Sequence, residues 1–347
     1  VKFDQQRHKA KELSRAMLSP AVALSGPQRG RSFVFNVSPL DEQLFDAIQK
    51  HNAVEVEHLI HKKCASVNAQ DRTGKTPLFV ACMLGDRELA QLLLNLGADI
   101  NAVDVNNWTA LHWSVRESQI DTTTLLLDSG ANVNRKAQFD ITPLHAAIMG
   151  GATNQILELL IKRGAEINPP FVPVDPSLSA SSGNLLEPTK SPLQLAVWHG
   201  NLQATKLLLE HGAYVDNISP ETLRKNLSTL TLSSPRLSSR NLTNNNNNSE
   251  VDIQSLALTG ITTPLHDGCF RGHLEIVKLL LSYNPHVAVF DTKGVTPLYY
   301  AISNGFIEVI KLLLEYSRNH PHWYSVSEEK YKDRTTPLHI AAKYDNV

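Results

Sequence analysis

Leucine-rich segments recur along the chain, and a segment of small apolar residues precedes each of them. The leucine-rich segments include "ELAQLLLNLG", "DTTTLLLDSG", "LQATKLLLEHG" and "FIEVIKLLLE". Each predicts a helix with an apolar face that must be buried. Glycines directly follow several of these segments, at positions 97, 130, 164 and 212. A left-handed residue commonly ends a helix at such a place.

A shorter helix is predicted just before each leucine-rich one. Its segment reads "TPLFVACMLG" at Thr76, "TALHWSVRES" at Thr109 and "TPLHAAIMGG" at Thr142, with starts 33 residues apart. Threonine suits the helix N-cap, and proline suits the first turn, where its missing N–H costs no hydrogen bond. With the further starts, the sequence predicts eight two-helix copies, the last cut short, beginning also at Leu44, Ser191, Thr263, Thr296 and Thr336.

The 33-residue period, the T-P-L-H-x-A opening, the leucine triplet and the segment G-A-D-I-N together resemble the ankyrin repeat. The resemblance covers residues 41–168 (copies 1–4), 188–216 (copy 5) and 262–347 (copies 6–8). It implies an all-α repeat solenoid of stacked helix–loop–helix units, with short β-hairpin fingers and a concave face. One unit cannot bury its leucine face alone, so stability is roughly a sum of nearest-neighbour terms.

Three segments fall outside the copies. Residues 1–40 carry seven Lys or Arg against two acidic residues, and we expect a basic, flexible segment. Residues 169–187 are rich in Pro and Ser, which predicts a loop insertion. Residues 217–261 are polar with an Asn run, which predicts a disordered insertion. Both insertions fall between the second helix of one copy and the first helix of the next, so the stack is expected to continue across them.

Overall charge and cysteine usage narrow the class of protein. Lys and Arg number 33 against 34 Asp and Glu, so no global attraction to nucleic acid follows. The three cysteines are far apart, which favours neither a disulfide framework nor a metal cluster, and a reducing compartment fits best. No apolar run approaches the ~20 residues of a membrane helix. We therefore expect a cytoplasmic or nuclear chain without cofactor or membrane insertion. Its abrupt ends suggest a fragment of a longer protein.

The stretch "NNWTALHWSVRES" brings together residue types that are typical of active sites. However, the slot of His112 holds His in some copies and Phe79 or Gln194 in others, and a catalytic base is not replaceable by Phe. The resemblance implies that this His ties the loop to the helix start through Thr109. Ser114 fills a slot that other copies give to Ala or Gly, which indicates a requirement for small size. No catalytic motif appears elsewhere, so an enzyme is not expected.

Function is then expected at exposed, variable positions. The resemblance implies that the loop residues before T-P-L-H and the outward positions late in the first helix line the concave groove. Many of these positions are apolar, and contiguous exposed apolar surface tends to mark an interaction site. Alternatively, some pack against neighbouring loops. The candidate partner-binding residues are Arg72, Lys75, Met83, Leu84, Asn106, Trp108, Arg116, Glu117, Phe139, Ile141, Met149, Trp198, His199, Phe270 and Arg271.

Some polar residues are candidates for modification. The Asn that closes each connecting piece, such as Asn101 or Asn134, is expected to hydrogen-bond within its finger, and the resemblance also makes these two candidate sites of β-hydroxylation. Ser228 and Ser234 in the second insertion are candidate phosphorylation sites, where added charge would switch the loop. The alternative is that this insertion is a neutral spacer.

The sequence thus predicts a non-catalytic scaffold or adaptor, a monomeric array that binds other proteins. The alternative is the targeting or regulatory array of a larger enzyme, ion channel or ubiquitin-ligase adaptor whose effector lies outside these 347 residues.

Overall fold

The computed structural model describes residues 38–169, 190–219, 221, 262–287, 289–291 and 293–319. All of them belong to one compact unit. The expected eighth copy, Ser228, Ser234, and nearly all of the expected N-terminal segment and of both insertions lie outside these residues.

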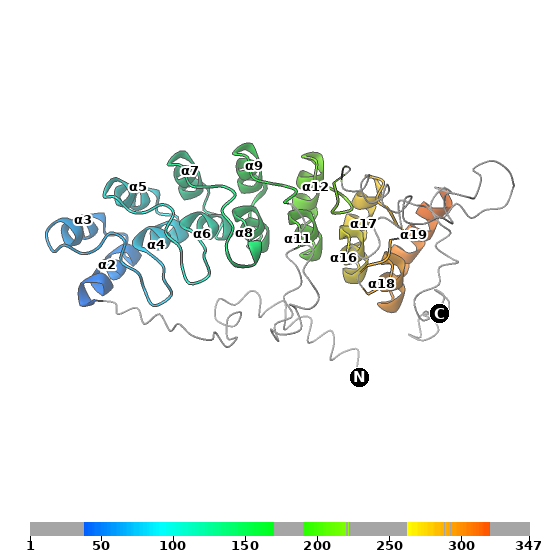
Figure 1. Cartoon of the computed structure of the whole chain (residues 1–347), viewed down its shortest axis with the longest axis horizontal. Coiled ribbons are helices and arrows are strands. Elements are labelled where there is room, and N and C mark those ends of the chain that lie inside the picture. Colours follow the sequence, from blue (N-terminus) through cyan, green and yellow to red (C-terminus); the bar gives the residue numbers. More distant parts are fainter. Residues whose placement is uncertain are drawn as a thin grey trace, which may run out of the picture. The chain divides into compact units, whose positions relative to one another are not determined.

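Seven helix pairs follow one another within the described residues (Figure 1). The first helices of the pairs are α2 (Pro39–Gln49), α4 (Pro77–Leu84), α6 (Ala110–Arg116), α8 (Pro143–Met149), α11 (Pro192–Trp198), α16 (Pro264–Arg271) and α18 (Pro297–Ser303). The second helices are α3 (Ala53–His61), α5 (Arg87–Asn95), α7 (Ile120–Asp128), α9 (Asn154–Lys162), α12 (Leu202–Glu210), α17 (Leu274–Leu281) and α19 (Ile307–Asn319).

The first helices begin and end where the sequence pattern predicts. Thr76 is the N-cap of α4 in an extended conformation, and Pro77 occupies the first helical position. Gly85 ends this helix with φ 75°, a left-handed conformation that glycine adopts without steric cost. The Gln119 side chain of the next copy also lies against this glycine, so a Cβ here would have to displace it.

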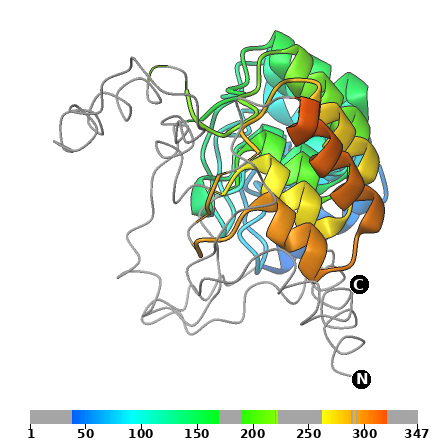
Figure 2. The ribbon, with the colours of Figure 1, turned by 90° about the vertical axis from the view of Figure 1, so that its right-hand side faces the viewer.

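Successive copies pack through both rows of helices. Each first helix contacts the next one, and from α5 onward each second helix contacts the next second helix. The contacts α8 to α11 and α11 to α16 are of this kind, although an insertion interrupts the sequence at each of these junctions. Seen from the side in Figure 2, the pairs lie one behind another. The stack therefore continues across both insertions, as expected from their positions.

The core between the rows is built from the predicted apolar slots. Leu78, Leu111 and Leu144, at the same slot of successive first helices, are fully or almost fully buried. Leu93 and Leu126, from the leucine triplets, are completely buried. Each such side chain contributes about 1.5–3 kcal/mol relative to an exposed one, which is why the copies stack.

The fingers differ from the expected β-hairpins, because no strand forms among the described residues. In the first finger Asp71 N donates to Lys75 O and closes a tight turn. The Asp71 carboxylate then accepts the N–H groups of Thr73 and Lys75 at 2.7 and 2.9 Å. A backbone donor bonded to this side chain is not available to extend a ladder, so the finger remains a turn.

Neighbouring fingers are nevertheless joined by backbone hydrogen bonds. Val105 N donates to Thr73 O at 3.2 Å, and Gln138 N donates to Asn106 O at 3.0 Å. The Gln138 side chain adds a bond to Val105 O at 2.9 Å. These bonds fix the positions of the fingers before α4, α6 and α8 relative to one another.

Candidate functional site

Three histidines of the first helices, His112, His145 and His266, each bond to the finger that follows their copy. His112 Nδ1 accepts the backbone N–H of Thr109 at 3.2 Å, so this nitrogen carries no proton and also accepts the Thr109 hydroxyl at 2.9 Å. His112 Nε2 then donates to Ile141 O at 3.2 Å, in the following finger. His145 and His266 make the same set of bonds. The structural role predicted for this slot is confirmed.

Burial keeps these three imidazoles neutral. Loss of hydration lowers the pKa of His112, His145 and His266 to about 4 each. Copy 2 has Phe79 in the slot, and there the buried Thr76 hydroxyl has no hydrogen-bond partner within the described residues. The histidine at this position therefore bonds to the following finger in the copies that have it, whereas copy 2 folds without this bond.

The closing asparagines connect copies rather than bonding within their own finger, so that expectation is wrong. Asn134 Oδ1 accepts from Glu166 N at 2.8 Å, and its Nδ2 donates to Gly164 O at 2.9 Å, both in the next copy. Asn68 and Asn168 bond to the same two places of their following copies. The exposed Asn101 side chain makes no such bond within the described residues, so it is the more accessible of the two hydroxylation candidates.

The candidate residues from copies 2 and 3 meet in a group that we name the Trp108 cluster: Lys75, Asp104, Trp108, Trp113 and Arg116. Lys75 Nζ lies 4.0 Å from the Trp113 ring centroid, and the Arg116 guanidinium lies 5.6 and 5.3 Å from the two rings. Asp104 accepts Trp108 N at 2.9 Å and Trp113 Nε1 at 3.1 Å. The rings themselves are 5.2 Å apart.

Burial in this cluster corrects one expectation. Trp108 was predicted to be exposed in the groove, but only 8% of it is accessible. The prediction is wrong because Asp104 accepts the Trp108 backbone N–H, and the Trp108 ring packs 5.2 Å from the Trp113 ring with Arg116 over both rings. Trp113 is equally buried, and its slot holds the apolar residues Val80, Ala146 and Leu195 in other copies.

A second group forms around copies 5 and 6, and we name it the Trp198 cluster: Lys190, Trp198, Phe270, Arg271 and Tyr300. The Trp198 and Phe270 rings stack at 5.9 Å with an interplanar angle of 7°, and Tyr300 meets Phe270 edge-on at 5.4 Å. Lys190 Nζ and the Arg271 guanidinium each lie 4.5 Å from the Trp198 ring. Trp198 is half-buried, whereas Phe270 is 39% exposed.

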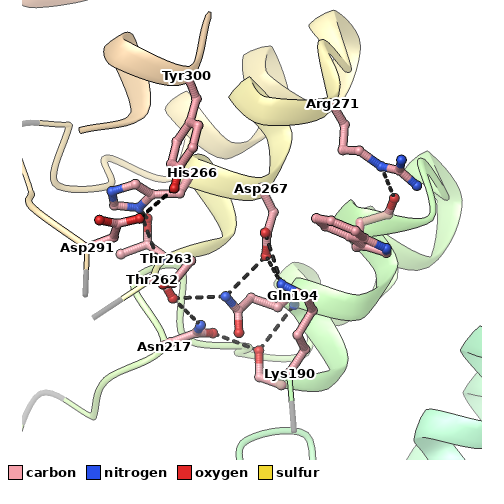
Figure 3. A network of polar contacts seen from close by, with 12 residues as sticks. Lys190, Gln194, Asn217, Thr262, Thr263, His266, Asp267, Arg271, Asp291 and Tyr300 are labelled. Atoms are coloured by element: carbon pink, nitrogen blue, oxygen red, sulfur yellow. Dashed lines mark hydrogen bonds and ion pairs between the residues drawn. The ribbon is translucent and has the colours of Figure 1, made fainter. Parts of the chain in front are cut away.

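Polar contacts fix this second cluster across the second insertion (Figure 3). Lys190 Nζ contacts the Asp267 carboxylate at 3.0 and 3.1 Å, and both side chains are nearly buried. Gln194 Nε2 donates to the same carboxylate at 3.1 Å and to Thr262 O at 2.9 Å. Asn217 Nδ2 also donates to Thr262 O, at 3.1 Å. The surface is therefore held by residues on both sides of residues 218–261.

Arg271 lies at the edge of that network (Figure 3). Its Nε donates to Trp198 O at 3.2 Å. Burial lowers the pKa of Arg271, and the Asp267 carboxylate opposes this effect. The pKa values of His199 and His273 are also lowered, first by burial and then by the charge of Arg271.

The other candidate residues make none of the ring contacts that define the two clusters. Leu84 and Phe139 are exposed apolar side chains, Met83, Ile141 and Met149 are half-buried, and Phe139 adopts a left-handed φ of 60° in the 3-10 turn η1 (Gln138–Asp140). Polar candidates range from half-buried to exposed: Arg72, Asn106, Glu117 and His199.

Sequence comparison between copies does not single out Asp104, Lys190 and Tyr300 of the two clusters, nor Asp267, the partner of Lys190. Asp104 and Lys190 lie in the loops before the first helices. The position after T-P-L-H holds Val80, Trp113, Ala146, Leu195, Asp267 and Tyr300 in successive copies. This range of chemistry is too wide for a core position, so it is the sequence signal for Asp267 and Tyr300.

Metal-binding clusters and membrane-spanning helices are both absent from the part of the chain that the structure describes. No group of three His, Cys, Asp or Glu side chains is placed there to hold a metal ion. No helix there combines the length and hydropathy that crossing a membrane requires.

Comparison with known proteins agrees with this architecture. The family model of ankyrin repeats in three copies matches residues 44–137, 129–219 and 240–323, well over half of the chain. The fold is similar to that of the human ASB11 ankyrin repeat domain, whose crystal structure matches with a TM-score of 0.53 and 21% sequence identity. That match covers 77% of this chain and 92% of the ASB11 domain. The chain belongs to the ankyrin repeat family.

Proposed function

We propose that this array is a non-catalytic scaffold or adaptor that binds a partner protein over the fingers and the last turns of its first helices. Ankyrin repeats generally mediate protein–protein interaction, and this chain presents mixed aromatic and cationic surface at the slots concerned. The observation that carries the proposal is Phe270, which stacks on Trp198 yet leaves 39% of its surface accessible. Aromatic residues and arginine are the types enriched at binding hot spots.

A rigid aromatic side chain is a favourable contact because little conformational freedom remains to be lost on binding. Phe270 is held on one face by Trp198 and at its edge by Tyr300, whose hydroxyl donates to Asp291 Oδ2 at 2.7 Å. We propose that the partner is a cytoplasmic or nuclear protein and that the array is monomeric. The alternative, a regulatory array of a larger protein, uses the same surface and differs only in what is attached to it.

The test compares two faces of the same array. Immobilised wild-type protein captures partners from a cell extract, and quantitative mass spectrometry compares it with two double variants. Phe139→Ala with Phe270→Ala removes exposed apolar groups from the proposed face. Val54→Ala with Ile307→Ala removes even more exposed ones, at 79% and 62%, from the second-helix side. We expect specific partners to be lost only with the first pair, and loss with the second pair alone would contradict the proposal.

A further inference from the structure

Arg271 is a half-buried cation whose hydrogen-bonding capacity is mostly unused. Its Nε donates to Trp198 O, but neither terminal nitrogen makes a hydrogen bond or ion pair within the described residues. A buried charge normally has a partner, because the loss of hydration is otherwise uncompensated. The guanidinium thus offers two N–H groups in a planar fork, the geometry that suits a carboxylate.

The nearest acidic group does not fill this role. Asp267 lies close enough to raise the pKa of Arg271 against the effect of burial. However, its two oxygens accept from Lys190 Nζ at 3.0 and 3.1 Å, and Oδ2 also accepts from Gln194 Nε2 at 3.1 Å. The charge of Lys190 is balanced by its ion pair with Asp267, whereas Arg271 forms no ion pair within the described residues.

The surroundings of Arg271 add apolar surface, and its charge acts on two neighbouring imidazoles. Its guanidinium lies 4.5 Å from the Trp198 ring, which holds it in place, and Phe270 stacks on the same indole. The charge of Arg271 lowers the pKa of both His199 and His273, second only to burial, so the two imidazoles lie within its field. An anion beside an apolar group matches this combination.

We propose that the Trp198 cluster binds an acidic segment of the partner protein, with an Asp or Glu carboxylate on the Arg271 guanidinium and an apolar side chain against Phe270. This assignment rests on the proposed function and names the chemistry of the partner. Nucleic acid fits less well, since its affinity comes from several cations that neutralise successive phosphates. Here Lys190 is already paired with Asp267, and the chain has a net charge of −1.

The test is selection of a phage-displayed library of random twelve-residue peptides on the full chain. We expect the enriched peptides to carry Asp or Glu within two residues of an aromatic or aliphatic residue. The best peptide, synthesised with a fluorescein label, is then titrated by fluorescence anisotropy. Arg271→Gln should weaken its binding by about 10- to 100-fold, the range of a hydrogen-bonded charge pair. Arg87→Gln, an exposed arginine of α5, is the matched control and should leave binding unchanged.

A double-mutant cycle locates the carboxylate. Replacing the acidic residue of the peptide by Gln should cost as much as Arg271→Gln, and the two changes together should cost no more than either alone. Arg271→Lys keeps the charge but loses the fork, so an intermediate affinity is expected, and this variant also serves if Arg271→Gln fails to fold by circular dichroism.

Other outcomes separate this inference from the proposed function. Enriched peptides without acidic preference, or with an affinity that Arg271→Gln leaves intact, overturn the acidic segment but keep a peptide-binding array. No enriched peptide, together with no partner lost in the two-face comparison, contradicts both. Binding of a fluorescent twelve-nucleotide DNA strand, or self-association in sedimentation, that Arg271→Gln abolishes would assign the cluster to another occupant and overturn the inference.

Discussion

Asp216 and His286 join copies 5 and 6 across seventy residues of sequence. Asp216 Oδ2 lies 2.7 Å from His286 Nδ1, and Asp216 Oδ1 accepts the His286 backbone N–H at 3.1 Å. Asp216 occupies the slot that Asn68, Asn134 and Asn168 fill in other copies. The inter-copy bond is thus kept at the junction with the longest insertion, with a carboxylate in place of an amide.

Removing this carboxylate should destabilise the junction. We expect Asp216→Ala to lower the free energy of unfolding by about 1–3 kcal/mol, because the buried His286 N–H loses its acceptor. Asp216→Asn restores the residue type of the other copies and should lie close to wild type. Urea unfolding followed by circular dichroism measures both. Equal losses in the two variants would show that the charge, rather than the acceptor, is what matters.

Shortening the second insertion should leave the stack intact. We replace residues 221–260 with a short Gly/Ser linker and expect a single unfolding transition with a similar midpoint. The bonds across the junction, from Lys190, Gln194, Asn217 and Asp216, all come from residues outside the deletion. A shorter loop also costs less entropy to close. Calorimetry that resolves two separate transitions would show that the insertion couples the copies.

Acid should destabilise the array through its buried histidines. His112, His145 and His266 have a pKa of about 4 in the folded chain, whereas an unfolded histidine has about 6.5. Between these values the unfolded state binds more protons, so stability is complete above pH ~6.5 and falls as the pH drops toward 4. Each histidine should cost about 1.4 kcal/mol per pH unit in this window.

His145→Gln checks the assignment of this acid sensitivity. Gln194 already fills the same slot in copy 5, where its side chain donates to Thr262 O as the histidines donate to the following finger. The variant should therefore fold and show a shallower loss of stability between pH 6.5 and 4. An unchanged slope in chemical denaturation at several pH values would place the sensitivity elsewhere.

The two tryptophans should respond differently to truncation. Trp108→Ala removes a buried indole that packs against the Trp113 ring and the Arg116 guanidinium, and we expect the free energy of unfolding to fall by about 3–5 kcal/mol. Trp198 is half-buried on one side of the Trp198 cluster, so Trp198→Ala should cost clearly less stability while weakening partner binding. Parallel urea titrations measure the difference, and equal losses would show that Trp198 belongs to the core.

Much of the fold could be predicted because it follows from repetition. Comparing one slot over several copies argues against a catalytic His112 and indicates that Ser114 needs only small size, while the loop-supporting role of His112 is implied by the ankyrin resemblance; both residues are buried. The positions of both insertions followed from the same period.

What could not be predicted depends on contacts that do not repeat. Trp108 is buried because the Trp113 ring and the Arg116 guanidinium pack against it, at slots where the other copies hold different residues. The Asp216–His286 pair spans an insertion whose length hides the period. The fingers lack strands because Asp71 and Asp104 bond to the backbone donors, a competition that is decided by geometry within each turn.

The Asn101 side chain, which makes no hydrogen bond to the next copy within the described residues, marks the junction between copies that should unfold first. Asn68, Asn134, Asn168 and Asp216 each connect their copy to the next, whereas within the described residues the Asn101 side chain connects copy 2 to nothing. In a row of units coupled to their neighbours, the weakest junction sets the boundary of partial unfolding. Copies 1 and 2 should therefore exchange their amide hydrogens together, earlier than copies 3 to 5, and a pulling force should detach them as one piece.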